Sequence, residues 1–267
     1  MTHLLRRCVY TLHFLAASVV GGLLFLAVSA AALAIAVVRG PEGHAAVFAA
    51  RTYSRVMQRI LGWRVEAEGT ERFAECAPTI VMARHQSNLD VVVYGEIFPR
   101  GAIAIGKKQL EWIPFFGRLW TATGNVLIDR RHTAAAMEAI RKAAEAARSA
   151  GVSVWVAPEG HRNMSREMLP FKKGVFHLAL SARFPVLPLA VSPLDAVLDA
   201  SRWAVRPGTI RVRVLPPVPV ADLAADDVPT LMARVRGVLE PAQRDLAVGA
   251  PPPILAPTAA PAREAEA

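Results

Sequence analysis

The sequence has little cysteine and few aromatic residues, and these shortages exclude several classes of protein. Two of its 267 residues are cysteines, Cys8 and Cys76, and they form no Cys-x-x-Cys motif. A framework of disulfides is therefore excluded, which favours a domain in a reducing, cytosolic-facing compartment. Aromatic residues make up 7% of the chain and there is no glycine-rich or arginine-rich tract, which argues against a nucleic-acid partner.

Acidic residues are scarce relative to basic ones. The formal net charge is +9 and the pI is about 10.3, so anionic partners such as anionic lipids or a phosphorylated substrate are favoured. Hydrophobic residues make up 53% of the chain and the mean hydropathy is +0.31, which is high for a purely soluble domain. The length is sufficient for one sizeable core with additional segments.

The N-terminal segment lacks charge over a long stretch, residues 8–38. As one helix this stretch would be ~46 Å long, against ~30 Å for the hydrocarbon core of a bilayer, so a single span would have to tilt. Gly21 and Gly22 divide the stretch, and a membrane-embedded helical hairpin is the alternative that we keep. A cleaved signal peptide is disfavoured because the apolar region of such a peptide is shorter.

Residues 44–63 predict an amphipathic helix. Apolar residues, Met57 and Leu61 among them, recur at helical spacing on one side, and Arg51, Arg55 and Arg59 recur every fourth residue on another. Such a helix suits the surface of an anionic membrane, although an ordinary surface helix has the same pattern. The excess of arginine after the apolar stretch predicts an inner-membrane protein whose main domain faces the cytoplasm.

The remainder of the chain alternates short apolar runs with helical stretches. The predicted strands are residues 79–83, 102–105, 152–156, 186–191 and 210–214, and the clearest predicted helices are residues 133–150 and 227–239. This alternation predicts an α/β domain with a mixed, mainly parallel sheet flanked by helices. We therefore expect a membrane anchor with an interfacial helix at 1–62, an α/β domain at 63–245 and a disordered tail rich in proline and alanine at 246–267.

The first of these strands leads into a histidine. His85 falls in the turn after the strand, and Asp90 falls in the first turn of a short helix that Ser87 and Asn88 are expected to cap. A carboxylate that holds one imidazole nitrogen leaves the other as a base that can activate an alcohol. Taken alone, the same spacing also fits a helix-capping loop with a structural histidine.

Three further clusters of charged residues and glycines follow or precede other strands. Their members are Lys107, Gly124, Asp129, Arg130, Glu159, Gly160 and Arg162. The guanidinium of arginine matches a phosphate, and a neighbouring glycine lets backbone N–H groups approach the same anion. Each cluster alone also fits a surface ion pair or an ordinary turn. Ligands of α/β sheets bind outside the carboxyl ends of the strands, however, where these clusters are expected to meet the histidine.

Together these segments resemble the four sequence blocks of the glycerophospholipid acyltransferases, especially those that acylate lysophosphatidate (1-acyl-sn-glycerol-3-phosphate). His85 and Asp90 match the His-x4-Asp block, and residues 124–130 match the Gly-x-x-x-Ile-Asp-Arg block. Residues 158–162 match the Pro-Glu-Gly-Thr-Arg block, and residues 186–190 match the apolar block that contains proline. The resemblance covers about residues 63–239, and four blocks in the right order are more specific than any one of them.

The resemblance implies a reaction and a role for each matched residue. His85 would take the proton of the sn-2 hydroxyl and Asp90 would orient the imidazole, while the alkoxide attacks the thioester of acyl-CoA or acyl-carrier protein and gives phosphatidate. Residues implied to hold the glycerol phosphate are Arg130, Glu159, Gly160 and Arg162, with Lys107, Gly124 and Asp129 beside them. No cofactor, metal or covalent acyl-enzyme is implied, and the partners would be membrane lipids and the two substrates.

Three residues depart from the family's pattern. Arg84 stands where asparagine is common and adds a positive charge beside the histidine, and His161 and Asn163 stand where threonine and serine are usual. His161 and Asn163 keep open another lyso-lipid acceptor, such as a lyso-ornithine lipid or a lysophospholipid. A non-catalytic lipid-binding membrane protein and a thioesterase are further alternatives, against which the retained His85 and Arg162 argue.

Overall fold

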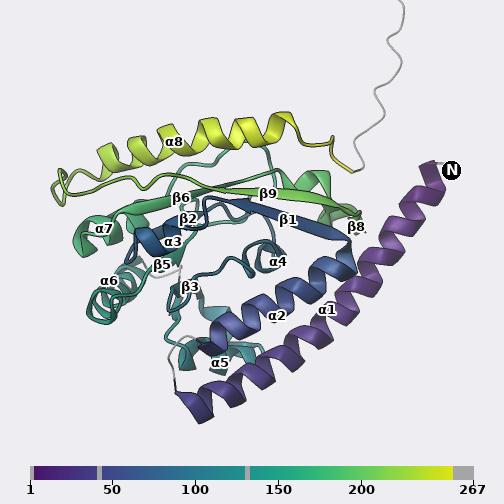
Figure 1. Cartoon of the computed structure of the whole chain (residues 1–267), viewed down its shortest axis with the longest axis horizontal. Coiled ribbons are helices and arrows are strands. Elements are labelled where there is room, and N and C mark those ends of the chain that lie inside the picture. Colours follow the sequence, from purple (N-terminus) through teal and green to yellow (C-terminus); the bar gives the residue numbers. More distant parts are fainter. Residues whose placement is uncertain (1–2, 41–43, 130–132, 255–267) are drawn as a thin grey trace, which may run out of the picture.

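A 7-stranded sheet runs through the centre of the domain (Figure 1). The computed structural model describes residues 3–40, 44–129 and 133–254. The sheet has the order β1-β9-β6-β2-β5-β3-β4, and β7 and β8 pair separately. The strands are β1 (Trp63–Glu68), β2 (Ile80–Ala83), β3 (Ile103–Lys107), β4 (Val126–Ile128), β5 (Val154–Val156), β6 (Val186–Val191), β7 (Leu198–Asp199), β8 (Ala204–Val205) and β9 (Gly208–Val214).

Five neighbouring strands of the sheet, from β6 to β4, are parallel. Strand β9 is antiparallel to β6, and β1 pairs with β9 in parallel, so the sheet is mixed but mainly parallel. The predicted fold class is therefore confirmed. Because the five strands share one direction, their carboxyl ends, including those of β2 and β5, meet at the same edge of the sheet.

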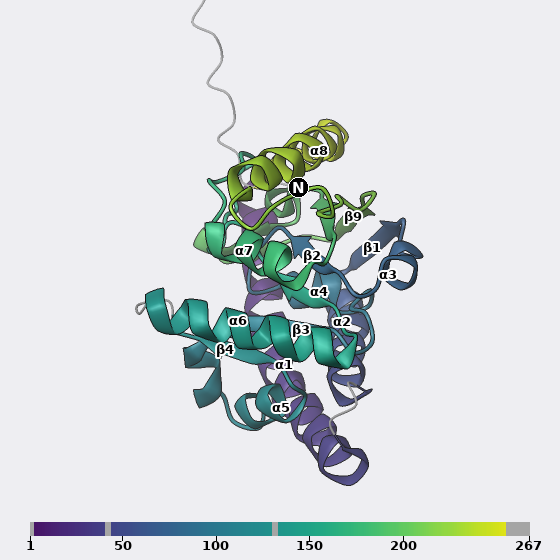
Figure 2. The same ribbon diagram turned by 90° about the vertical axis from the view of Figure 1, so that its left-hand side faces the viewer.

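Helices cover both faces of the sheet, which explains why its central strands are continuously apolar. Ile80 and Met82 of β2 face the side covered by α6, α7 and α8, and Val81 and Ala83 face the side covered by α4, α2 and α1. Figure 2 shows α6 and α7 on the near side of the molecule and α1 on the far side. The helices are α1 (His3–Arg39), α2 (His44–Leu61), α3 (Arg72–Glu75), α4 (Asp90–Tyr94), α5 (Phe116–Ala122), α6 (Thr133–Ala150), α7 (Lys173–Ala182) and α8 (Val228–Val248), with short 3-10 turns at Lys108–Trp112, Leu194–Ala196 and Ala200–Arg202.

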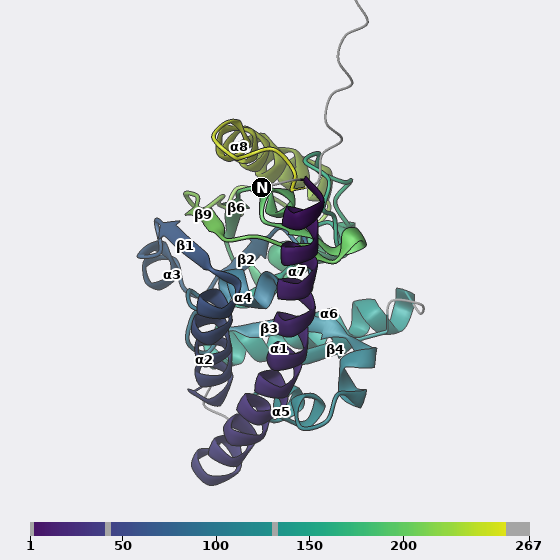
Figure 3. The ribbon, with the colours of Figure 1, turned by 90° about the vertical axis from the view of Figure 1, so that its right-hand side faces the viewer.

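Helix α1 is one unbroken helix of 37 residues, which runs beside α2 along the flank of the domain (Figure 3). The alternative of a helical hairpin divided at Gly21 and Gly22 is therefore wrong. A Cβ atom on Gly21 would lie 2.9 Å from Cε of Met57, closer than carbon atoms pack. Gly21 thus allows α1 to approach α2 rather than ending the helix.

The apolar stripe of α2 faces protein, which corrects the prediction that it faces lipid. Met57 and Leu61 are each 2% exposed and belong to the core on the α4 side of the sheet. Arg55 and Arg59 are exposed on the opposite side of the helix. The periodicity correctly predicted the helix. Its apolar stripe, however, is covered by the rest of the domain.

The C-terminal helix and the segment after it also differ from the prediction. Helix α8 continues to Val248 across Pro241, because Leu239 before the proline and Leu246 after it are both buried in the core. Beyond the helix, the carbonyl of Pro251 accepts a hydrogen bond of 3.0 Å from Nη2 of Arg166. Residues 246–254 therefore pack against the domain, and the rest of the predicted tail lies outside the described residues.

We expect Gly21→Leu to destabilise the protein, because the added side chain must displace Met57 and separate α1 from α2. Overpacking of this kind costs about 1–3 kcal/mol. Gly22→Leu is the matched control, since a Cβ atom on Gly22 meets nothing within 4 Å. Thermal unfolding in detergent measures the difference, and equal melting temperatures for the two variants would contradict the close contact.

Candidate active site

The turn between β2 and α4 brings His85 and Asp90 into contact. Nδ1 of His85 lies 2.5 Å from Oδ2 of Asp90. A carboxylate can only accept a hydrogen bond, so Nδ1 carries the proton and Nε2 is left as a base. The His85 side chain is 34% exposed and that of Asp90 is 11% exposed, so the imidazole reaches solvent while the carboxylate behind it is sheltered. The predicted pairing across five positions therefore exists in the structure.

Two backbone amides fix the Asp90 carboxylate. The amide of Gln86 donates to Oδ2 at 2.8 Å and that of Ser87 donates to Oδ1 at 3.0 Å. Burial raises the pKa of the Asp90 carboxyl, while the hydrogen bond from His85 and those from the two amides act to lower that pKa. The turn thus closes around the carboxylate before α4 begins.

The predicted cap of this helix needs a correction. Helix α4 begins at Asp90, its N-cap residue is Leu89, and no side chain caps it. The hydroxyl of Ser87 instead accepts a hydrogen bond of 3.2 Å from the amide of Leu89. Ser87 therefore stabilises the turn and not the helix, because the chain is still turning where the sequence pattern predicted a helical residue.

The loop after β5 carries the residues predicted to bind the acceptor phosphate. Strands β2 and β5 are neighbours, so this loop lies directly beside the histidine turn. The two are joined by the amide of Asn163, which donates to the carbonyl of His85 at 2.8 Å. Arg162 and His161 are exposed, and Gly160 has a φ of 71°, a conformation that favours glycine. Arg162 is thus exposed to solvent in the loop next to the histidine turn.

Glu159 is placed differently from its neighbours in the loop. It is 1% exposed, and its Oε2 accepts hydrogen bonds from Nδ2 of Asn163 at 2.8 Å and from the amide of Leu169 at 3.2 Å. Its Oε1 lies 3.2 Å from Nε of Arg84. The carboxylate is therefore engaged within the protein and faces no open surface.

The other predicted binding residues lie at increasing distances from His85. Lys107 ends β3 and is exposed, and Asp129 directly follows β4. At ~4.8 Å per strand, β3 is ~10 Å and β4 ~14 Å from β2. Gly124 precedes β4, so it lies toward the amino ends of the strands, away from His85. Its φ of 77° suits a turn at this position. Arg130 lies outside the described residues.

One residue of the site was not predicted from the sequence. Gln86 is 1% exposed, and its amide group bonds the chain after β6, donating to the carbonyl of Ser192 at 3.1 Å and accepting from the amide of Leu194 at 3.0 Å. These contacts attach the histidine turn to the strand on its other side. The sequence carries no signal of this, because the partners are backbone groups far away in the chain.

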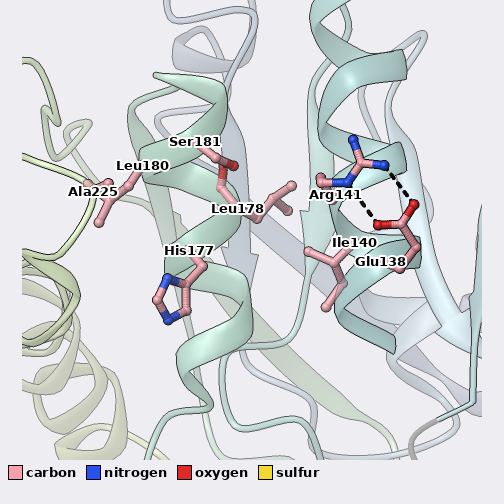
Figure 4. A pocket seen from close by; sticks show the side chains of 8 residues that line it. All are labelled: Glu138, Ile140, Arg141, His177, Leu178, Leu180, Ser181 and Ala225. Carbon is pink, nitrogen blue, oxygen red and sulfur yellow. Dashed lines mark hydrogen bonds and ion pairs between the residues drawn. The ribbon is translucent and has the colours of Figure 1, made fainter. Parts of the chain in front are cut away.

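The described part of the chain has no cluster suited to a metal ion, and a hollow between two of its helices lies apart from the predicted site residues. Among residues 3–40, 44–129 and 133–254, no group of three or more His, Cys, Asp or Glu is arranged to hold a metal ion. A hollow between α6 and α7 has Ile140, His177 and Leu178 on its walls, and Arg141 pairs with Glu138 beside it (Figure 4). None of the predicted site residues lines this hollow.

The central part of the chain matches a known protein family. The model of the family described as Acyltransferase matches residues 64–192. This segment contains β2 with the His85–Asp90 turn and β5 with the loop that carries Arg162. The match thus includes both segments that the sheet brings together at one edge.

Several curated relatives resemble the chain over this region. The 1-acyl-sn-glycerol-3-phosphate acyltransferase of Salmonella typhimurium is 36% identical over 181 residues, which are 68% of this chain and 73% of that protein. The enzyme of the same name from Escherichia coli K12 is 35% identical over the same shares. The human 1-acyl-sn-glycerol-3-phosphate acyltransferase alpha is 38% identical over 177 residues, and the chain spans 62% of its length.

A solved structure has the same fold. The crystal structure of the 1-acyl-sn-glycerophosphate acyltransferase of Thermotoga maritima matches with a TM-score of 0.72, covering 92% of this chain and 98% of that one. The sequence identity is 23%, so this likeness supports the fold alone. The shared architecture includes most of the chain described above.

We expect Asp90→Asn to remove a pH-dependent component of stability. Because the pKa of Asp90 is raised in the folded state, the wild type loses stability as the pH rises from about 4 through that pKa, and the variant does not. The melting temperature of the variant relative to wild type should therefore increase over this pH range. A difference that is constant with pH would show that the buried carboxyl titrates normally.

Proposed function

Because the chain belongs to the glycerophospholipid acyltransferase family, we propose that it transfers a fatty acyl group to the sn-2 hydroxyl of 1-acyl-sn-glycerol-3-phosphate and so forms phosphatidate. The observation that carries the proposal is the 2.5 Å contact between Nδ1 of His85 and Oδ2 of Asp90. The names of the curated relatives support the acceptor, since each of the three described above is a 1-acyl-sn-glycerol-3-phosphate acyltransferase.

In the proposed reaction His85 is the general base. Nε2 takes the proton of the sn-2 hydroxyl as the oxygen attacks the thioester carbon, and Asp90 stabilises the imidazolium that forms. The tetrahedral intermediate then collapses, the carbon–sulfur bond breaks, and the proton on Nε2 passes to the leaving thiolate. The donor is a thioester, acyl-CoA or acyl-carrier protein, and the residues described here need no cofactor and no covalent acyl-enzyme for this sequence.

The phosphate of the acceptor is proposed to bind beside the base. Arg162 supplies a guanidinium fork, and Gly160 allows the backbone of the same loop to approach the anion. Lys107 adds a positive charge from the end of β3. Two cations at this edge of the sheet suit a phosphomonoester, which carries more negative charge than a phosphodiester. The resemblance also assigns Arg130 to the phosphate.

A second acceptor class is favoured by His161. The side chain of His161 is exposed next to Arg162, where the family usually has threonine, and it is in a position to contact a larger head group. Another lyso-lipid, such as a lyso-ornithine lipid or a lysophospholipid, is therefore the alternative substrate. Asn163 does not favour this alternative, because its side chain is buried against Glu159.

We further propose that α1 attaches the protein to the inner face of the cytoplasmic membrane. Residues 7–39 are long and apolar enough to cross a bilayer, by length and composition. The domain nevertheless packs along this helix, with Phe116 of α5 against Phe25 and Trp203 against Phe14. A helix perpendicular to the membrane would carry this flank of the domain into hydrocarbon, so we favour a helix that lies within one leaflet.

The outer side of α1 is expected to bind membranes. Leu12 and Leu23 are 70% and 66% exposed, and replacing both by glutamine should weaken vesicle binding at least about tenfold. Val238 and Val248 on α8 are also exposed, and their replacement by glutamine is the matched control, expected to leave binding unchanged. Flotation with vesicles containing phosphatidylglycerol measures the effect. Equal loss in both double variants would contradict the orientation.

Acyl transfer by isolated membranes tests the base and the phosphate site together. His85→Ala should lower kcat at least about 10³-fold, because no other group replaces the base. Arg162→Ala should raise the KM for lysophosphatidate about 10–100-fold, the cost of a lost charge-assisted hydrogen bond. His177→Ala and Arg166→Ala are controls outside the site.

Three results would contradict the proposed function. If wild-type membranes acylate only a lyso-lipid without a phosphomonoester, the alternative acceptor is the substrate. Retention of activity in His85→Ala would show that His85 is not the general base. A wild type that binds lipid but transfers no acyl group would favour a non-catalytic lipid-binding protein.

A further inference from the structure

The residue directly before the proposed base is a fully buried arginine. Arg84 is 1% exposed, and among the residues that the structure describes no side chain as well buried is larger. Its guanidinium does not reach solvent or the open side of the site. Arginine is strongly disfavoured in protein interiors unless paired, so this position requires specific partners.

The groups that the Arg84 side chain contacts through its nitrogen atoms lie in one segment of the neighbouring loop. Nη2 donates to the carbonyl of Ser165 and, at 2.8 Å, to the carbonyl of Glu167, and Nε lies 3.2 Å from Oε1 of Glu159. Glu159 is also 1% exposed. Both charges are thus removed from water and face each other between the turn that carries His85 and the loop that carries Arg162.

Asn163 completes the connection between the two loops. Its Nδ2 donates to Oε2 of Glu159 at 2.8 Å and to the carbonyl of Glu167 at 2.7 Å, and its amide donates to the carbonyl of His85 at 2.8 Å. On the other side, the hydroxyl of Tyr94 donates to the carbonyl of Arg84 at 2.9 Å. The segment between β5 and α7 contains no helix or strand, so the place of Arg162 depends on polar contacts such as these.

Stability does not explain why this ion pair is buried. The Nε–Oε1 contact lacks hydrogen-bond geometry, and Nη1 of Arg84 has no hydrogen-bond partner among the residues that the structure describes. An incompletely bonded buried pair is often no more stabilising than apolar residues of similar size, because desolvation offsets the attraction. What the pair does provide is a fixed relation between two irregular loops.

We propose that the Arg84–Glu159 pair positions Arg162 relative to His85, and thereby sets the distance at which the enzyme holds the acceptor's phosphate from the base. This proposal rests on the proposed function for the identity of the acceptor. Glu159 is then a positioning residue that acts through Arg84 and Asn163, and it does not itself contact the glycerol phosphate. The His85–Asp90 contact is made within its own turn and does not depend on the pair.

The test removes the pair without leaving a lone buried charge. The double variant Arg84→Met with Glu159→Gln keeps side chains of similar volume at both positions. It also keeps the hydrogen bonds of residue 159 to Asn163 and Leu169, but it removes the ionic contact between residues 84 and 159. We expect the KM for lysophosphatidate to rise at least about tenfold, while the KM for the acyl donor, the pH profile of kcat and the melting temperature stay close to wild type. The single variants, each with one uncompensated charge, should unfold at lower temperature than the double variant.

A second ion pair in the same segment provides the control. Arg166 binds Asp195 at the surface, with Nε 2.9 Å from Oδ2, and Arg166→Met with Asp195→Asn removes a pair of the same chemistry. This control should leave the KM for lysophosphatidate unchanged. A wild-type KM in the Arg84–Glu159 double variant would overturn the proposal. So would a parallel loss of kcat, donor affinity and melting temperature, since that pattern indicates a merely structural role.

Hydrogen exchange separates this proposal from the assignment of the acceptor. If the wild type does not acylate lysophosphatidate, the proposed function fails, but the link between the loops can still be measured. The amide of Asn163, bonded to the carbonyl of His85, should exchange at least about tenfold faster in the double variant than in wild type or in the Arg166–Asp195 control. Unchanged exchange at Asn163 would overturn the positioning role whatever the substrate is.

Discussion

The hydrogen bond between His85 and Asp90 is the constraint on which the rest of the site depends. Residues five apart do not meet on a continuous helix, so the contact requires a strand to end, a turn to form and a helix to begin within eight residues, 83–90. The buried strand β2 fixes the start of this turn, and the amides of Gln86 and Ser87 fix its carboxylate. An imidazole oriented in this way is suited to the role of general base that we propose for it.

The parallel sheet meets the second requirement of the proposed reaction, a cation in the loop next to the histidine turn. Because β2 and β5 are adjacent and parallel, the turn after one and the loop after the other lie next to each other. The backbone bond from Asn163 to His85 and the buried pair of Arg84 with Glu159 then join them. The site is therefore formed by two irregular segments whose relative position depends on a few polar contacts. Substitutions at these contacts are expected to alter acceptor binding without altering the proposed base.

Sequence patterns predicted what depends on neighbours in the chain. The apolar runs predicted β6 to the residue, β2 to within one residue and β5 to within two, and the His-x4-Asp spacing predicted the pair at the site. Contacts between distant segments were not predictable. The hairpin alternative divides the apolar stretch at Gly21, but this glycine accommodates Met57 within an unbroken helix. The resemblance implies that Glu159 holds the glycerol phosphate, and no sequence pattern shows that this carboxylate is buried against Arg84.

A crystal structure with lysophosphatidate bound tests the central claim most directly. The account predicts that the phosphate contacts Arg162 and that the sn-2 hydroxyl lies within hydrogen-bond distance, about 2.6–3.2 Å, of Nε2 of His85. Glu159 should remain paired with Arg84 and make no contact with the ligand. A phosphate bound away from Arg162, or a hydroxyl directed away from Nε2 while the phosphate is in place, would contradict the account.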